Sequence, residues 1–401
     1  MENKDRESHR ITQKGRIAAL QEGIGAKGWG GVLLFYSRDI FYYTGTARPA
    51  YLLVTPTEYL LFIRSGFDLA LDDVFIEEER VVEERYLDSL AQETLPMIKE
   101  SQIGTELDLL PANQFFQWKE IFKGCEWVDA SPLILAQRRR KDPLEIKLMK
   151  RACEAQDAGH RALLNQLRPG ITELELAAAV EHAQRLAGHE GVFFMRRPDF
   201  FMSHGPIASG KNLSRFSGVV HSVTGIGLST AVPVGPSRKR IEKGDIVVVD
   251  IPTLTGGYHA DQTRTYCLGK ATPKAKALHN ALLGIWEHVN AHARPGIRCS
   301  DLFVMAENRA EEYGAGDAFL SFGKGKRGHM IGHGIGLECT EPPVISKTDH
   351  SFLRENDVMA VEIHMFQEGV GVVKIEDMLH VGADKNDILT KSPRRLFEVV
   401  S

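Results

Sequence analysis

The chain has 401 residues, of which 43% are hydrophobic and 8% aromatic, so it is long enough to bury two hydrophobic cores. Its formal net charge of -4 gives no electrostatic reason to expect nucleic acid or an anionic membrane as a partner. The five cysteines are scattered, the N-terminus lacks the apolar stretch of a signal peptide, and no apolar run approaches the roughly 20 residues that span a bilayer. These features predict a cytoplasmic globular protein with reduced thiols.

Strand-like apolar runs alternate with helical stretches from about residue 10 to residue 136. The clearest strands lie in residues 29–36 and in residues 50–64, where two strands are joined by a Pro-containing turn. Strands that alternate with helices are typical of α/β folds. Residues 10–136 are therefore predicted to form an α/β domain.

A basic run at residues 137–142 precedes a helix that we expect to begin near Asp142. Asp142 can cap this helix, Pro143 suits its first turn, and Glu145 complements the helix dipole. Four basic charges at a linker are usually solvated, so the run does not indicate a nucleic-acid site. The boundary between domains is predicted here, and the second domain is expected to span residues 142–401.

The second domain contains an internal repeat. The sequence RPGITELEL begins at residue 168 and is echoed by RPGIRCSDL at residue 294. Each copy places a Pro-Gly turn and a polar cap candidate before an amphipathic helix, and Thr172 with Glu175 fits a capping box. Two similar acidic strands also recur, one ending at Asp250 and the other at Glu362. These echoes predict a duplicated αβ unit whose halves are related by a pseudo-twofold axis.

The acidic strands point to a metal site near that axis. The run GDIVVVD ends at Asp250 and is followed by Asp261, while NDVMAVE ends at Glu362 and is followed by Glu376. A carboxylate at the end of a buried apolar run is costly to desolvate unless a cation or a partner compensates it. Four such carboxylates would repel one another unless they neutralise about two divalent ions.

A glycine-rich stretch at residues 323–343 lies between the two half-sites and contains His333. One imidazole with four carboxylates is an oxygen-rich ligand set, harder than the His/Cys sets of structural zinc sites. Two ions about 3.5–4 Å apart can share a hydroxide and make it nucleophilic near neutral pH. The predicted ligands are Asp250, Asp261, His333, Glu362 and Glu376.

These five residues and their surroundings resemble the pita-bread metalloenzymes, a family that includes prolidase, aminopeptidase P, methionine aminopeptidase and creatinase. The motifs that carry the resemblance are DIPTLTGGYHADQTRTY, GHGIGLECTEPP, VEIHMF and KIEDMLHV, and SRDIFYYTG at residues 37–45 resembles the N-terminal domain of the prolidase, aminopeptidase P and creatinase branch. The resemblance implies an α+β fold with a creatinase-like α/β domain before a pita-bread catalytic domain. It also implies a homodimer.

The resemblance further implies roles for the five residues. Asp250 and Asp261 would bind one metal ion, and Asp261 and Glu376 would bridge the two ions. His333 and Glu362 would complete the ligand set of the second ion. Glu362 and His333 would be the catalytic residues, with Glu362 acting as the general base. Two divalent ions are implied, with Mn²⁺ as the first choice and Co²⁺, Fe²⁺ or Zn²⁺ as alternatives.

Several supporting positions depart from the peptidase pattern. Thr340 stands where the peptidases usually carry a second histidine, and Lys374 stands in place of a common arginine. Residues 225–245 lack the histidine of a PHY-like motif, and the pair Ile363-His364 follows Glu362 where a Pro-Gly pair is usual. Four other histidines are candidate replacements. His364 shares strand parity with Glu362, and His259 shares it with Asp261; the remaining candidates are His221 and His329.

The leading hypothesis is a dinuclear metal-dependent hydrolase that uses a metal-bridging hydroxide on Xaa-Pro peptides, as a dipeptidase or an aminopeptidase. Its substrate would be a short peptide or a small amide. An alternative is a small-molecule hydrolase or lyase of the creatinase kind, since both of the supporting histidines that the peptidases usually carry are missing here. A third hypothesis, a non-catalytic binding module, is disfavoured because all five ligands are present.

Overall fold

The computed structural model describes residues 3–197, 207–215 and 222–400. The chain forms two units, Met1–Arg138 and Arg139–Ser401, which are described separately. Among the helices of the described residues, none combines the length and the apolar character that crossing a bilayer requires.

The N-terminal unit is built on a six-stranded sheet with the order β4-β3-β2-β1-β5-β6. The sheet is mixed, because β1 pairs antiparallel with β2 and parallel with β5. Its strands are β1 (Gly31–Leu34), β2 (Ala50–Val54), β3 (Tyr59–Ile63), β4 (Val81–Glu83), β5 (Gln102–Thr105) and β6 (Glu126–Asp129), and its helices are α1 (Asn3–Lys27), α2 (Ser37–Thr44), α3 (Phe67–Asp73), α4 (Leu87–Thr94), α5 (Ala112–Ile121) and α6 (Ser131–Arg139). The predicted α/β class is confirmed.

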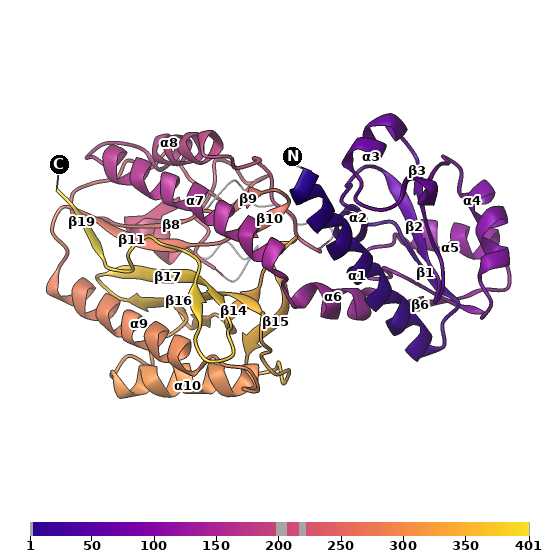
Figure 1. Ribbon diagram of the computed structural model, residues 1–401. Coiled ribbons are helices and arrows are strands. Elements are labelled where there is room, and N and C mark those ends of the chain that lie inside the picture. Colours follow the sequence, from indigo (N-terminus) through magenta and orange to yellow (C-terminus); the bar gives the residue numbers. More distant parts are fainter. Residues whose placement is uncertain (1–2, 198–206, 216–221, 401) are drawn as a thin grey trace. The chain divides into compact units, whose positions relative to one another are not determined.

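Helices cover both faces of this sheet (Figure 1). On one face, Leu33, Leu53 and Phe62 pack with Trp118 of α5 and with neighbouring apolar side chains in a buried cluster. Alternate residues of the same strands, such as Val32 and Leu52, are also buried, on the opposite face. A sheet that is buried on both faces explains why these strands appear in the sequence as continuous apolar runs.

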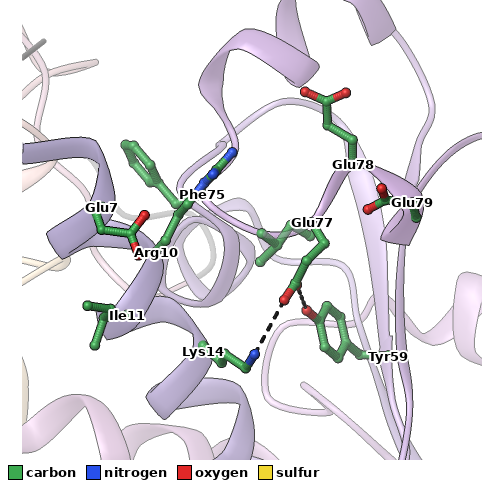
Figure 2. Close-up of a pocket in the computed structure, with 10 residues that line it drawn as sticks. Glu7, Arg10, Ile11, Lys14, Tyr59, Phe75, Glu77, Glu78 and Glu79 are labelled. Atoms are coloured by element: carbon green, nitrogen blue, oxygen red, sulfur yellow. Dashed lines mark hydrogen bonds and ion pairs between the residues drawn. The ribbon is translucent and has the colours of Figure 1, made fainter. Parts of the chain in front are cut away.

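A hollow of about 510 Å³ opens on the N-terminal unit between α1 and the segment that follows α3. Figure 2 shows Lys14 and Tyr59 both directed at Glu77, which accepts a hydrogen bond from the tyrosine hydroxyl. The ammonium of Lys14 lies 3.6 Å from the Glu77 carboxylate, and both side chains are largely exposed. An exposed pair of this kind contributes little to stability.

The C-terminal unit contains a nine-stranded sheet. Its main path runs, in order, through β15 (Glu341–Ser346), β14 (Met330–Gly334), β16 (Val358–Gln367), β17 (Gly371–His380), β11 (Thr263–Leu268), β8 (Ile246–Asp250) and β7 (Ile207–Ser209). Its longest strands, β16 and β17, form an antiparallel pair at the centre. In Figure 1, one helix pair lies on each side of the strands. These pairs are α7 (Pro143–Gln166) with α8 (Glu173–Leu186), and α9 (Pro273–His292) with α10 (Cys299–Glu312).

Both predicted helix starts are confirmed by their capping contacts. The Asp142 carboxylate accepts from the backbone N–H groups of Leu144 and Glu145 at 2.9 Å, and Glu145 accepts in return from the Asp142 N–H. Thr172 and Glu175 make the same reciprocal pair of bonds at the start of α8. Such capping boxes satisfy N–H groups that the helix itself leaves without partners.

The duplication extends to individual backbone hydrogen bonds. In the first half, the N–H of Gly170 donates to the carbonyl of Ile241, and the N–H of Ile241 donates to Ile171, at 2.9 and 2.8 Å. In the second half, the N–H of Gly296 donates to Leu353, and the N–H of Leu353 donates to Ile297, also at 2.9 and 2.8 Å. Each Pro-Gly turn is therefore tied to the segment just before its acidic strand, which places the two strands equivalently.

Arg264 fixes the register between β11 (Thr263–Leu268) and β17. Its side chain is 2% exposed and its guanidinium donates to Asp377 Oδ1 at 2.6 Å and to the carbonyl of Glu376 at 2.7 Å. Asp377 also contacts the partly exposed Arg394, but Arg264 is its buried cation partner, and losing it leaves the buried carboxylate with too little positive charge around it. We expect Arg264→Met to lower the free energy of unfolding of the metal-free protein by about 3–5 kcal/mol in urea titrations.

Arg151→Met is the matched control for this prediction, because Arg151 lies exposed on α7. A loss of stability no larger than that of the control would show that Arg264 is not needed to compensate Asp377. The remaining partners of Asp377, which include Thr390 and Arg394, would then be sufficient.

Candidate metal centre

Four of the five predicted ligands lie on strands of the nine-stranded sheet, and Asp261 lies in the short connection between β10 (Tyr258–Ala260) and β11. Asp250 ends β8, and His333 lies on β14. The remaining two ligands, Glu362 and Glu376, are directly paired between β16 and β17. Thr263 is paired with both Asp250 and Glu376, so this register brings the first half-site against the second.

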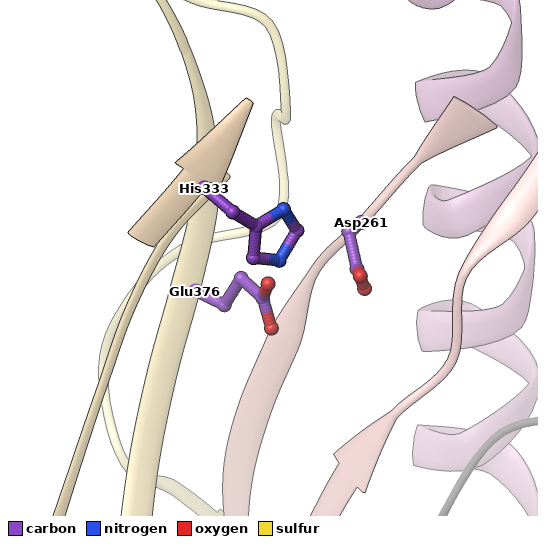
Figure 3. Close-up of side chains that lie close together, drawn as sticks. All are labelled: Asp261, His333 and Glu376. Atoms are coloured by element: carbon purple, nitrogen blue, oxygen red, sulfur yellow. The ribbon is translucent and has the colours of Figure 1, made fainter. Parts of the chain in front are cut away.

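The side chains meet in two overlapping groups of three. Ligand atoms of Asp261, His333 and Glu376 all lie within 4.8 Å of one another, as do those of Asp250, Glu362 and Glu376. Figure 3 shows the first group, with the carboxylates and the imidazole directed toward a common space. Glu376 belongs to both groups, which is the position expected of a bridging ligand. The pairing of Asp250 with Asp261 on one metal, which the resemblance implies, stays a prediction.

The electrostatics of the first group indicate an excess of negative charge. Burial raises the pKa of Asp261 well above its usual value, and the nearby Asp250 raises it further. Burial and the charge of Asp261 likewise raise the pKa of Glu376. Among the described residues, Asp261 Oδ1 is a buried oxygen that has no hydrogen-bond partner. A divalent cation would supply the missing compensation, so these residues fit a metal.

The second group is already in contact with a cation of the chain itself. The Lys374 ammonium lies 2.5 Å from Asp250 Oδ2, 2.7 Å from Glu362 Oε2 and 3.1 Å from Glu376 Oε2. Although burial opposes ionisation of Glu362, the charges of Lys374 and His333 outweigh it and lower the pKa of this carboxyl to about 2. Burial also opposes ionisation of Lys374, but Asp250 and Glu362 raise its pKa well above the ordinary lysine value.

A cavity of about 220 Å³ opens onto the five ligands. Two of the predicted supporting residues, Thr340 and Lys374, line it, and so does His329. Sequence reasoning missed other lining residues, among them Ser222 and Cys339. The Ser222 hydroxyl accepts from Lys374 Nζ at 2.8 Å, and the Cys339 thiol donates to Asp261 Oδ2 at 3.4 Å. Their only sequence signal is adjacency, since Ser222 follows His221 and Cys339 precedes Thr340.

The remaining candidate histidines differ in their surroundings. His259 is buried, with Nδ1 2.9 Å from the carbonyl of Gly336 and Nε2 accepting from the N–H of Phe194 at 3.0 Å. Both ring nitrogens are thus used by the scaffold, so we do not propose a substrate contact for His259. His221 lies outside the described residues.

His364 is paired with Lys374 across β16 and β17, so it shares the face of Glu362. Its ring packs against Phe322, with 4.1 Å between ring centroids. Burial, with a smaller effect of Lys374, lowers the pKa of His364 to about 4. Its Nε2 is buried without a hydrogen-bond partner among the described residues. His364 is therefore neutral at pH 7.

Comparison with known proteins assigns each of the two units to a protein family. Residues 147–383 match the model of metallopeptidase family M24, and residues 16–140 match the creatinase/prolidase N-terminal domain. The chain is 29% identical to the Xaa-Pro dipeptidase of Pyrococcus horikoshii over 372 residues, which cover 91% of this chain and 94% of that protein. A second relative, the Xaa-Pro dipeptidase of Pyrococcus furiosus, is 29% identical over 365 residues, which cover 90% and 92% of the two chains.

Solved structures of other proteins resemble this chain over nearly its whole length. The prolidase from Pyrococcus horikoshii has a TM-score of 0.79 at 27% identity and covers 95% of this chain and 99% of its own. The X-Pro aminopeptidase from Thermotoga maritima has a TM-score of 0.78 at 26% identity, with 93% and 98% covered. The predicted order of a creatinase-like domain and a pita-bread domain is confirmed. Since the family model matches more than half of the chain and the acidic cluster fits a divalent cation, this protein is a metallopeptidase that belongs to family M24.

Proposed function

We propose that this metallopeptidase cleaves Xaa-Pro peptides, as a dipeptidase or an aminopeptidase. The observation that carries the proposal is the convergence of four carboxylates and one imidazole on a single cavity, with the buried Asp261 Oδ1 left for a cation. Relatives that match over nine tenths of the chain are named Xaa-Pro dipeptidases, which supports the choice of substrate.

We further propose that the cluster provides two cation positions. Asp261, His333 and Glu376 would hold one ion, and Asp250 and Glu362 would hold the other together with the shared Glu376. Oxygen-rich sets of this kind suit Mn²⁺, which we propose first, with Co²⁺, Fe²⁺ or Zn²⁺ as alternatives. When bound, such ions polarise a substrate carbonyl and make a coordinated water acidic near neutral pH.

The protein's own residues would then position the substrate and move protons. With a pKa of about 2, the Glu362 carboxylate is ionised at neutral pH and is able to accept a proton. His333 Nε2 lies 3.7 Å from Glu362 Oε1, so the two side chains face the same space. Thr340 cannot exchange protons near pH 7, whereas His329, another residue that lines the cavity, carries an imidazole. The cavity of about 220 Å³ supports a short peptide or a small amide as the substrate.

The second candidate is hydrolysis or cleavage of a small molecule that is not a peptide. It is favoured by Thr340, a neutral side chain on the cavity wall where the resembling peptidases carry a histidine. General acid–base catalysis contributes about 10²–10⁴-fold, so a peptide reaction here would have to proceed without that contribution or obtain it from His329.

The test is an assay of the purified chain, stripped of metal and then supplied with Mn²⁺, Co²⁺, Fe²⁺ or Zn²⁺. The substrates are Xaa-Pro dipeptides, longer Xaa-Pro peptides and matched Xaa-Ala peptides. We expect metal-dependent release of the first residue from the Xaa-Pro series and little turnover of the Xaa-Ala series. Metal-dependent stabilisation without cleavage of any peptide would move the assignment to the small-molecule candidate.

We also propose that the protein acts as a homodimer, as the resemblance implies, and that it acts in the cytoplasm. Sedimentation equilibrium of the purified chain tests the first point. A mass near 44.7 kDa, that of a single chain, at all concentrations would contradict it.

A further inference from the structure

Lys374 lies at one of the two cation positions. Its ammonium contacts Asp250, Glu362 and Glu376 at 2.5–3.1 Å, and these are the three residues of the second candidate group. In the first group, by contrast, Asp261 Oδ1 has no hydrogen-bond partner among the described residues. The two positions that the strands create are therefore unequal before any ion arrives.

The charge balance of the cluster determines how the two positions can bind ions. The four carboxylates carry four negative charges, and one divalent ion with the Lys374 ammonium would balance three of them. A second divalent ion added beside the ammonium would bring the cluster to an excess of positive charge. Since the interior strengthens Coulomb forces relative to water, like charges at ligand distance oppose one another strongly.

Displacing the ammonium is also costly. The Lys374 side chain is 1% exposed, and Ser222 supplies one further acceptor at 2.8 Å. A second ion at the same carboxylates must remove these contacts and leave a buried ammonium in need of new partners. No equivalent obstacle is present at Asp261 Oδ1, which is buried and lacks a hydrogen-bond partner within the described ranges.

We propose that Lys374 acts as a built-in competitor for the second metal ion. The chain binds one divalent ion tightly through Asp261, His333 and Glu376, and it takes up a second ion at Asp250 and Glu362 only at much higher free metal concentration. This inference rests on the proposed metal-dependent function, but it concerns how the two positions fill and not which peptide is cleaved.

The test is equilibrium dialysis of the full chain against buffered Mn²⁺, with bound Mn²⁺ counted by mass spectrometry. For the wild type we expect a plateau at one ion per chain, with the second binding step weaker by more than about tenfold. Lys374→Met keeps the length of the side chain and removes its charge, so the second step should tighten by about tenfold or more. Lys239→Met is the control, because Lys239 pairs with Asp245 at 2.6 Å, away from the ligands.

The outcomes separate this inference from the proposed function. Two Mn²⁺ ions bound with indistinguishable affinity by the wild type would overturn the inference, even if Lys374→Met failed to fold. An unchanged second step in a folded Lys374→Met would also overturn it. One tight ion without cleavage of Xaa-Pro peptides would contradict the proposed substrate and leave the inference standing, whereas no bound Mn²⁺ in any variant would contradict both.

Discussion

Replacing Glu362 by glutamine is expected to lower kcat on Xaa-Pro dipeptides by about 10²–10⁴-fold, the range of a lost general base. The amide keeps the volume of the side chain but cannot accept a proton. With a pKa of about 2, the Glu362 carboxyl of the wild type is fully ionised near neutral pH. The loss of kcat should therefore be the same from about pH 6 to about pH 8. Steady-state kinetics with saturating Mn²⁺ measure it.

Glu368→Gln is the control, since Glu368 is exposed just beyond the end of β16. Circular dichroism should show that both variants keep the fold. Because the folded pKa of Glu362 is below the ordinary value of 4.5, its ionised form stabilises the protein above that pH and loses this effect as the pH falls toward about 2. Glu362→Gln should therefore also be less stable at pH 7. Activity within a factor of two (about 0.4 kcal/mol) of wild type would exclude the assigned role.

Replacing Asp261 by asparagine is expected to have the opposite effect on stability while also abolishing activity. Burial, with the charge of Asp250, raises the folded pKa of Asp261 above the ordinary value of 3.8. The sign follows from linkage: a raised carboxyl pKa favours the fold below the unfolded pKa, and this advantage is lost as the pH rises through the folded pKa. At pH 7, which lies above the unfolded pKa, the buried carboxyl group of the metal-free protein is therefore a burden that asparagine removes.

Differential scanning calorimetry of metal-free protein tests this prediction. We expect Asp261→Asn to raise Tm by several degrees at pH 7, since about 2–4 °C corresponds to each kcal/mol in a domain of this size. Added Mn²⁺ should raise Tm of the wild type far more than that of the variant. Asp384→Asn, at an exposed position of the same unit, is the control. A lower Tm in metal-free Asp261→Asn than in the control would mean that the carboxylate is compensated without a cation.

The part of the site that could be predicted from sequence is the part that local patterns encode. Asp250 and Glu362 are recognisable because each is placed among apolar residues that fold as buried strands. The capping boxes at Asp142 and Thr172 are similarly local, since both partners lie within one helical turn. Duplicated motifs add long-range information, because a repeated pattern implies a repeated environment.

Contacts between segments that are distant in the sequence could not be predicted from such local patterns. Strand alternation puts Lys374 on the face of Glu376, but only the sheet order brings its ammonium to Asp250. Alternation also suggested that His259 faces the metal, yet the backbone of Phe194 and Gly336 engages both of its ring nitrogens. Ser222 is invisible from sequence for the same reason, since its partner Lys374 is 152 residues away.

The two halves of the C-terminal unit contribute different ligands to each cation position. Asp261 comes from the first half and meets His333 and Glu376 from the second, while Asp250 meets Glu362 and Glu376 across the same divide. An ion bound at either position would therefore act as a removable cross-link between the repeats. All five cysteines are free thiols, so a bound ion, and not a disulfide, would cross-link the repeats in this structure. Chelation should accordingly expose the segments between the repeats to proteases before it unfolds either repeat.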